Sequence, residues 1–184
     1  MPRFRRFPKR FGLSRGLSRK ALEVAVSGGA STGGENRILV VCFGNICRSP
    51  LGERLLRAAL PTATVSSAGI AALIGRGPNE TTACVAAARG VSLADHVARQ
   101  FTSSMGAGQD LVLVMEPWHR RTIIADAPQL QGRVMLFDHW TGARAIPDPY
   151  RRPGSVHAAV FDMLIQGADA WASRIGQGIS GPDA

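Results

Sequence analysis

The sequence predicts one α/β domain: a four-stranded parallel sheet with helices on both faces, in three layers. The first observation is a set of short apolar runs that read as strands, at residues 38–41, 64–70, 111–115 and 133–137. The second is the helical pattern between successive runs, since strands that alternate with helices are typical of parallel sheets. The third is size, because 184 residues with 45% hydrophobic residues suit one domain with its own core.

The first part of the domain is predicted to form a strand, a helix and a second strand. Ile38–Val41 is a continuous apolar run, as expected for a strand buried on both faces. A helix is predicted over residues 50–60, because Pro50 suits the first helical position and Pro61 ends the pattern. The strand at 64–70 follows directly.

The second part continues in the same way. An alanine-rich stretch at 80–89 is expected to be helical and to stop at Gly90, which can adopt the left-handed conformation of a C′ residue. The pattern then predicts, in order, a strand at 111–115, a helix at 119–127, a strand at 133–137 and an amphipathic helix at 157–175. We find no internal repeat and no second domain.

The positive charge is concentrated at the N-terminus. The chain carries a net charge of +9, and residues 1–20 contain eight basic residues and no acid. We therefore expect a basic, disordered extension over residues 1–35, one folded domain over 36–178 and a flexible end at 179–184. A misassigned start and a nucleic-acid or anionic-membrane contact are the alternatives for the extension. For the domain itself we expect no nucleic acid.

The composition gives little support to a membrane-spanning protein or to a disulfide-stabilised one. No run approaches the roughly 20 apolar residues of a transmembrane helix. Three cysteines, Cys42, Cys47 and Cys84, do not form a disulfide framework and suit a reducing cytoplasm. We expect a cytoplasmic protein that is a monomer or a weak dimer.

A short stretch after the first strand carries the chemistry. Residues 41–50 read Val-Cys-Phe-Gly-Asn-Ile-Cys-Arg-Ser-Pro, between a strand and a helix. In such a loop backbone N–H groups can surround an anion, and the helix N-terminus favours a thiolate at Cys42. Arg48 can offer two parallel donors to phosphate oxygens. Ser49 can cap the helix or donate to the Cys42 sulfur.

This string resembles the active-site loop of the low-molecular-weight protein tyrosine phosphatases. The resemblance implies a cysteine nucleophile at Cys42 and a phosphate-binding loop formed by Phe43, Gly44, Asn45, Ile46, Cys47, Arg48 and Ser49. It also implies that no metal or other cofactor is required. From the residues, Gly44 gives the backbone room and Asn45 tolerates left-handed dihedral angles.

A general acid must protonate the leaving oxygen, and two aspartates follow late strands. Asp148 lies in Ile-Pro-Asp-Pro-Tyr, where prolines stiffen the loop, and Asp138 lies in Phe-Asp-His-Trp. Asp148 is the better candidate from the residues, and the family resemblance selects it, because Asp-Pro-Tyr is the family's general-acid motif. Asp138 is then expected to be a turn or cap residue.

The similarity runs from about Arg37 to Ile175 and is strongest to a bacterial branch encoded with capsule and exopolysaccharide export genes. That branch implies a partner, a bacterial tyrosine autokinase that carries phosphotyrosine. The substrate cleft is expected to be walled by Phe43, Leu73, Ile74 and Tyr150. The family also implies a redox role for Cys47, a disulfide with Cys42, although Cys47 can equally pack beneath the loop.

The remaining reactive side chains are expected to be structural. The four histidines, His96, His119, His139 and His157, have no metal-ligand spacing, and we predict no metal site. Trp118, Trp140 and Trp171 are expected to be packing or rim residues, and Cys84 a small core residue.

Two other functions are compatible with parts of the sequence. A thiol-dependent arsenate reductase uses the same fold but needs further cysteines, and the chain after the loop offers Cys84 alone. A non-catalytic phosphate-binding or nucleic-acid-binding module would depend on the basic extension. The presence of Cys42, Arg48 and Asp148 together argues for the enzyme.

Overall fold

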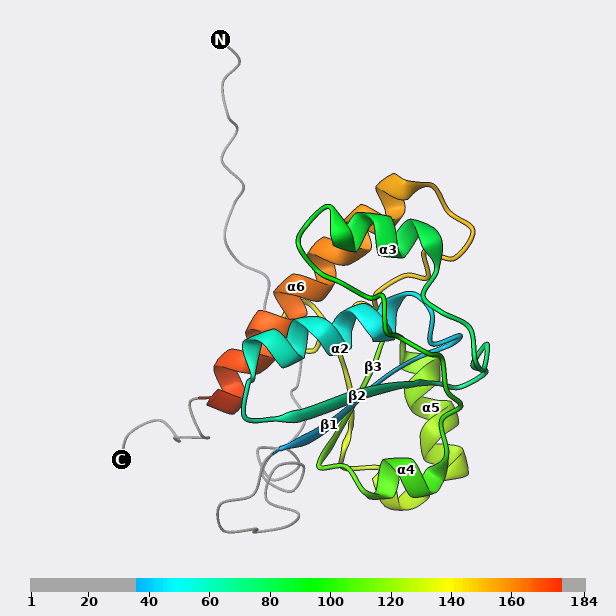
Figure 1. The fold of residues 1–184 in the computed structure, drawn as a ribbon. Coiled ribbons are helices and arrows are strands. Elements are labelled where there is room, and N and C mark those ends of the chain that lie inside the picture. The colour runs from blue at the N-terminus through cyan, green and yellow to red at the C-terminus, as the bar shows by residue number, and fades with distance from the viewer. Residues whose placement is uncertain (1–35, 177–184) are drawn as a thin grey trace, which may run out of the picture.

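A parallel sheet of four strands lies at the centre of the computed structural model, which describes residues 36–176 (Figure 1). Its strands are β1 (Arg37–Cys42), β2 (Thr64–Gly69), β3 (Leu111–Val114) and β4 (Val134–Leu136). They lie in the order β2-β1-β3-β4, and every neighbouring pair is parallel. The predicted fold class is confirmed, and the predicted strands differ from the observed ones by about a residue at their ends.

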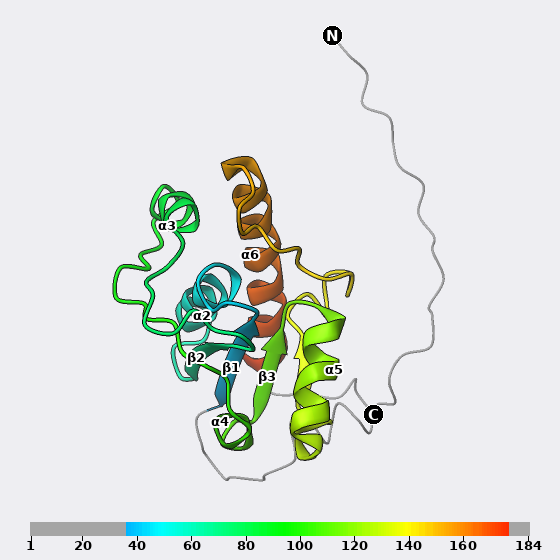
Figure 2. The ribbon, with the colours of Figure 1, turned by 90° about the vertical axis from the view of Figure 1, so that its right-hand side faces the viewer.

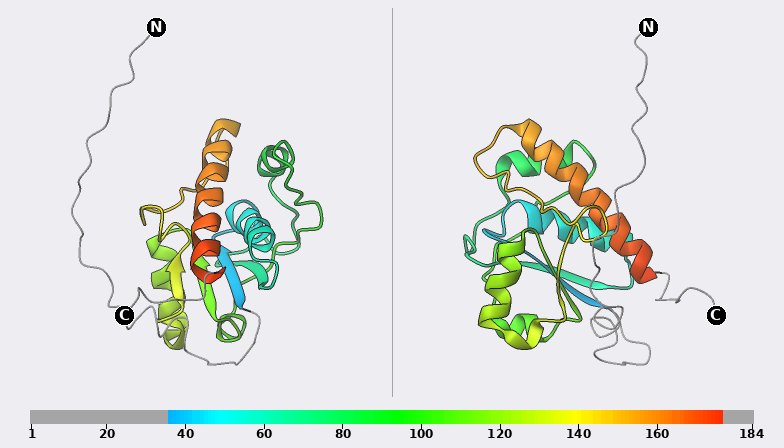
Figure 3. Two further views of the ribbon diagram at one scale, coloured as in Figure 1. Left: turned by 90° about the vertical axis from the view of Figure 1, so that its left-hand side faces the viewer. Right: turned by 180° about the vertical axis from the view of Figure 1, so that it is seen from behind.

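Alternate side chains of β1 face two separate hydrophobic layers. Ile38 and Val40 pack with the apolar sides of α2 (Arg48–Ala59) and α6 (Gly154–Gly176). Leu39 and Val41 face the opposite side, where α5 (Pro117–Asp126) packs. Figure 2 shows α2 and α5 on opposite sides of the sheet, and Figure 3 shows α6 running diagonally across the back. Burial on both faces explains why β1 and β3 are apolar without alternation.

The helix α2 begins two residues earlier than predicted. Its first residue is Arg48, so Pro50 occupies the third helical position instead of the first. Proline is tolerated there because the first N–H groups of a helix have no partner within it. The early start places Arg48 at the point where the loop becomes the helix.

The helix α3 (Glu80–Ala87) packs against α6, and Gly90 follows it with a φ of +79°. The predicted stop at Gly90 is therefore confirmed. Cys84 on this helix is exposed, so the prediction that it is a core residue is wrong. Alanines lie next to it at position 83 and one turn after it at positions 87 and 88, and such small residues do not mark which face is buried.

Two short elements and several helix ends were missed by the sequence pattern. The structure adds α4 (Ser103–Ala107) and a 3₁₀ turn, η1 (Pro128–Leu130). Elements of one turn are too short to display a helical period. The helices α5 and α6 begin two and three residues before the predicted starts, with Pro117 at the beginning of α5.

The predicted extension over residues 1–35 and the predicted flexible end at 179–184 lie outside the described residues. Within residues 36–176, none of the helices combines the length and the hydrophobicity needed to cross a membrane.

Candidate active site

The loop after β1 directs its carbonyl groups outward. The backbone carbonyl oxygens of residues 42–46 each accept a hydrogen bond from a surrounding segment. In order, the donors are Ile70 N, Ala71 N, Leu73 N, His96 Nε2 and Asn79 N. In a planar trans peptide the N–H points away from the C=O. The N–H groups of the following residues therefore turn to the inside of the loop, where they can surround an anion.

Asn45 fixes this loop from within. Its φ of +54° lies in the left-handed region, as its residue type allows, and the residue is fully buried. The side-chain amide donates to Ser49 Oγ at 2.9 Å and Ser67 Oγ at 3.0 Å, and its oxygen accepts from Arg99 N at 2.9 Å. The side chain is thus used inside the protein, so a contact of Asn45 with an anion would come from its backbone.

The last residue of β2 lies directly against the loop. A Cβ atom on Gly69 would come within 2.6 Å of the Phe43 carbonyl oxygen and 2.9 Å of Asn45 N. Such contacts are shorter than real Cβ atoms make, so only glycine fits here without moving the backbone.

The Cys42 sulfur is buried at the base of the loop, 3.0 Å from Ser49 Oγ. Asn45 donates to the same hydroxyl oxygen, so the hydroxyl hydrogen remains for an acceptor. Cys42 Sγ is closer than the Ala68 carbonyl oxygen, which lies 3.3 Å away. Of the two roles expected for Ser49, the structure supports the bond to sulfur, because Ser49 lies inside α2 and Cys47 is the N-cap.

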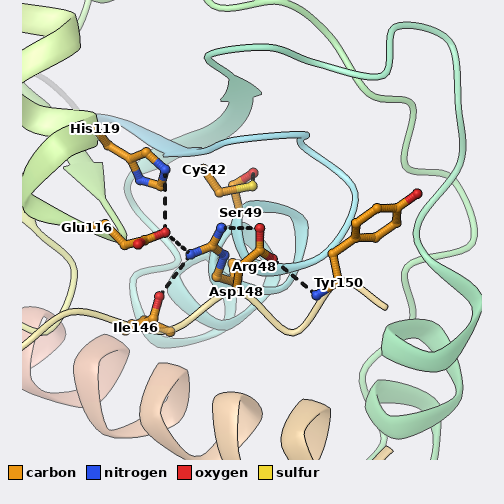
Figure 4. A network of polar contacts seen from close by, with 8 residues as sticks. All are labelled: Cys42, Arg48, Ser49, Glu116, His119, Ile146, Asp148 and Tyr150. Carbon is orange, nitrogen blue, oxygen red and sulfur yellow. Dashed lines mark hydrogen bonds and ion pairs between the residues drawn. The ribbon is translucent and has the colours of Figure 1, made fainter. Parts of the chain in front are cut away.

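Arg48 connects the loop with two distant segments (Figure 4). Its side chain is 1% exposed, and Nη1 donates to Glu116 Oε1 at 2.6 Å and to the Ile146 carbonyl oxygen at 2.9 Å. Nη2 lies 2.9 Å from Asp148 Oδ2. Arg48 Nε is buried without a hydrogen-bond partner among the described residues, which leaves a donor for a bound ligand.

Glu116 and His119 form the back of the site. Burial acts to raise the pKa of Glu116, but the hydrogen bond and the charge of Arg48 outweigh it and lower that pKa. Burial lowers the pKa of His119 to about 4, and the charge of Arg48 acts in the same direction. The site therefore holds an ionised Glu116 and a neutral His119 at neutral pH, with His119 Nε2 3.7 Å from Glu116 Oε1.

The structure separates the two candidate aspartates. Asp148 lies at Arg48, and its Oδ1 accepts from Tyr150 N at 3.2 Å, which holds the carboxylate in its turn. Asp138 Oδ2 instead accepts from the backbone N–H groups of Arg144 and Ala145, at 2.8 and 3.0 Å. Asp138 is therefore a turn residue, as predicted.

The four predicted cleft residues are partly exposed around the loop. The exposed fractions are 43% for Phe43, 44% for Leu73, 70% for Ile74 and 42% for Tyr150. Phe43 follows Cys42 directly, and Leu73 N bonds to the loop at Gly44. Tyr150 projects beside Asp148, away from Arg48 (Figure 4).

The other predicted residues are distributed as follows. Cys47 is buried at the helix start, and this burial raises the pKa of its thiol to about 12. His96 and His157 are buried and hydrogen-bonded, the latter through Nδ1 to Thr82 Oγ1. Within residues 36–176 there is no group of three or more His, Cys, Asp or Glu side chains that could hold a metal ion.

Sequence reasoning missed the roles of Glu116, His119 and the Asn45 network. Glu116 had a usable signal, because it follows β3 by two residues and so lies at the carboxyl edge of the sheet, next to the loop after β1. Ser67 and Arg99 carried no such signal, since ordinary polar residues become network members only through the fold.

Fold and loop together define the class: an α/β protein whose loop after the first strand turns its backbone N–H groups inward, beside a buried arginine and above a buried cysteine. A family model described as low molecular weight phosphotyrosine protein phosphatase matches residues 37–180. The chain belongs to this family, and the resemblance stated from its loop is confirmed.

Similar proteins and a similar solved structure support the same family. The chain is 46% identical over 140 residues to the probable low molecular weight protein-tyrosine-phosphatase AmsI of Erwinia amylovora, covering 76% of this chain and 97% of that protein. It is 46% identical to Wzb of Escherichia coli K12, covering 76% and 95%. The structure of Vibrio vulnificus Wzb in complex with benzylphosphonate is 43% identical, covers 77% of this chain and 99% of that one, and superposes with a TM-score of 0.74. These matches place the chain in the expected bacterial branch.

Proposed function

We propose that this protein hydrolyses phosphotyrosine in a protein substrate through a phosphocysteine intermediate on Cys42. The observation that carries the proposal is the arrangement around its sulfur: inward N–H groups from the loop, the Ser49 hydroxyl at 3.0 Å and the fixed guanidinium of Arg48. This arrangement suits a phosphate group that must spread negative charge over its oxygens in the transition state.

In the first step the Cys42 thiolate attacks phosphorus. The S–P bond forms as the P–O bond to tyrosine breaks, and the carboxylic acid of Asp148 gives its proton to the leaving oxygen. Arg48 and the loop N–H groups hold the three other oxygens. A bound phosphate competes with Asp148 for Arg48 and weakens their ion pair, so that the carboxylate takes up a proton from water and can give it to the leaving oxygen.

In the second step a water molecule attacks the same phosphorus. Asp148 takes a proton from the water, the S–P bond breaks, and phosphate and free Cys42 are released. The hydrogen bond from Ser49 stabilises the sulfur as it leaves, since charge returns to it in this step.

The preference for tyrosine over serine rests on the depth of the loop. Cys42 is 2% exposed, and the rim formed by Phe43, Leu73 and Tyr150 stands around it. A long aromatic side chain can reach the sulfur between these walls, whereas a serine phosphate would keep its backbone outside.

The physiological partner in this proposal is a bacterial tyrosine autokinase that controls capsule or exopolysaccharide production. Support comes from the similarity to the Wzb and AmsI phosphatases. We also propose a cytoplasmic location, monomer or weak dimer, and chemistry without a metal or other cofactor. The partner is tested by incubating the phosphorylated autokinase of the same bacterium with wild type and with Cys42→Ser. Loss of phosphotyrosine with wild type alone supports it, and an unchanged level contradicts it.

Cys47 is proposed as the redox partner of Cys42. Oxidation of Cys42 to the sulfenic acid, followed by attack of the Cys47 sulfur, would form a disulfide and release water. Wild type treated with hydrogen peroxide should then regain activity with thiol reductant, and Cys47→Ser should not. Equal recovery of both proteins would contradict the role.

The activity is tested with a phosphotyrosine peptide in the presence of chelator and reductant. Wild type should turn over, Cys42→Ser should be inactive, and Cys84→Ser should serve as the cysteine control, because Cys84 is exposed on α3. Asp148→Asn should lower kcat by about 10²–10⁴-fold with phosphotyrosine, and by less with aryl phosphates whose leaving groups need no proton. Activity of Cys42→Ser, or no activity of the folded wild type, contradicts the proposal, and arsenate reduction is then the next assay.

A further inference from the structure

We propose that Trp118 determines substrate specificity by contacting an apolar side chain next to the phosphotyrosine of the substrate protein. This inference rests on the proposed function. It adds to the four-residue cleft a wall supplied by α5, and it names the kind of sequence that the enzyme prefers.

Most of the exposed large apolar residues of the described chain lie in segments that contact the Cys42 loop or the Asp148 turn. Seven large apolar side chains in residues 36–176 are substantially exposed: Phe43, Leu73, Ile74, Val97, Trp118, Tyr150 and Ile165. All but Ile165 belong to the loop, to segments hydrogen-bonded to it or to its neighbours, or to the site turn. Scattered exposed apolar residues need no explanation, but a group around a binding loop indicates an interaction surface.

Trp118 extends this group to the side of the site opposite Tyr150. The centroid of its ring lies 5.8 Å from the ring centroid of Phe43, with the two planes inclined by 59°. The ring centroid of His119 is 4.1 Å away, in an edge-on contact. Figure 4 shows His119 and Tyr150 on opposite sides of Cys42. A phosphotyrosine in the loop would therefore have Tyr150 on one side and the Phe43–Trp118 pair on the other.

Packing against the sheet does not account for the size of Trp118, although its side chain makes a hydrogen bond to Glu116. Trp118 is the second residue of α5, after Pro117, and α5 buries His119 and Ile123 against the sheet instead. Trp118 keeps 36% of its surface exposed, although its two neighbouring rings cover part of it. A large aromatic residue held by packing and open on one side loses little conformational entropy on binding, as at protein interfaces.

The charges nearby favour an apolar partner over a cationic one. A tryptophan face can attract lysine or arginine. Arg121, however, lies three residues further along α5, on the same side of the helix, and is exposed. The neighbouring carboxylate, Glu116, is already paired with Arg48. A cation at Trp118 would therefore face positive charge, whereas an aromatic or aliphatic side chain would cover Trp118 without this cost.

The test compares two phosphotyrosine peptides of equal length. One has phenylalanine and leucine on either side of the phosphotyrosine, and the other has glycine at both positions. The measured quantity is the ratio of kcat/KM for the apolar peptide to that for the glycine peptide, taken within each variant. Any effect of a substitution on the Cys42 loop acts on both peptides and cancels in the ratio.

For wild type we expect a ratio of roughly three- to tenfold, the range typical of one aromatic contact. Trp118→Ala should bring the ratio close to one, and Trp118→Phe should keep most of it. Ile165→Ala, an exposed apolar residue on α6 away from the loop, should keep the wild-type ratio.

A wild-type ratio of one, or an unchanged ratio in Trp118→Ala, overturns the inference while the phosphatase proposal stands. A higher rate with lysine-flanked than with apolar peptides also overturns it, since the wall would then bind cations. If wild type hydrolyses none of the peptides, the proposed function fails and this inference fails with it.

Discussion

Arg48 Nη2 and Asp148 Oδ2 lie 2.9 Å apart, so the donor expected to hold phosphate is paired with the carboxylate expected to protonate the leaving group. The two groups come from opposite ends of the domain sequence, one from the start of α2 and the other from the turn before α6. A phosphate bound at the free Nε of Arg48 would compete with Asp148 for Nη2 of the same guanidinium. We propose that the pair in this way couples binding of the substrate to release of the acid.

Removal of the Asp148 charge should strengthen phosphate binding. In Asp148→Asn the competing carboxylate is lost, and so is its repulsion of the bound oxygens. We expect inorganic phosphate to bind about fivefold more tightly, the scale of a partly exposed ion pair. Titration calorimetry measures this affinity. Asp162→Asn is the matched control, because Asp162 pairs with Arg89 and not with Arg48. Equal or weaker binding to Asp148→Asn would contradict the coupling.

Glu116 should contribute more to stability than Asp148, although both pair with Arg48. Glu116 is 25% exposed and bonds at 2.6 Å, whereas Asp148 is 42% exposed. Glu116→Gln leaves a buried guanidinium without its closest anion and should lower the free energy of unfolding by about 1–3 kcal/mol. Asp148→Asn should cost less than about 1 kcal/mol. Urea denaturation at pH 7 compares the two, and a larger loss in Asp148→Asn would show that this ranking is wrong.

Much of the site could be predicted from the sequence because its central parts are local. The strand, the loop and the start of α2 are contiguous, so residues 41–50 already carry the loop geometry that we propose binds an anion. Asp148 was identifiable by its prolines and by the family motif. The position of Glu116 after β3 indicated the carboxyl edge of the sheet, but its pairing with Arg48 could not be derived in this way, because it depends on β1 and β3 being neighbours in the strand order.

The errors in the sequence reading have a related cause. Helical periodicity places a residue on a face only when neighbouring residues differ in polarity, and the alanines around Cys84 do not. The start of α2 was set too late because Pro50 was given the first position. Three further positions can accept proline at the N-terminus of a helix, and the pattern alone does not choose among them.

Gly69 should tolerate no side chain. In Gly69→Ala the new Cβ would approach the backbone of the loop at Phe43 and Asn45, to 2.6 and 2.9 Å, so the loop must move. We expect a loss of about 1–3 kcal/mol in stability and a lower kcat/KM. Gly77→Ala is the control, since its Cβ would have no neighbour within 4 Å. If both variants behave as wild type, the close approach does not shape the loop.

His119 should make the protein less stable in weak acid. Burial lowers its pKa in the folded state to about 4, below the unfolded value of 6.5, so the unfolded chain takes up the proton first. Stability is fully present above pH 6.5 and falls as the pH drops toward 4. Between pH 7 and pH 5 the loss from this residue should be on the order of 2 kcal/mol.

The replacement His119→Phe removes the titrating group and keeps a ring of similar size. Its stability should therefore fall less than that of wild type between pH 7 and pH 5, as measured by urea denaturation at both values. For each protein the free energy of unfolding at pH 5 is subtracted from that at pH 7. A loss of stability that His119→Phe causes equally at both pH values cancels in this difference. Identical losses would show that His119 does not carry this pH dependence.

The central claim is the covalent step at Cys42, and the most direct measurement is to locate the phosphate. Wild type is mixed with a phosphotyrosine peptide, quenched in acid within milliseconds, digested and examined by mass spectrometry. We predict that a phosphate appears on the peptide that contains Cys42 and that it is absent in Cys42→Ala. A rapid release of phosphate with no label on Cys42 at any time, or a label on another residue, would contradict the account.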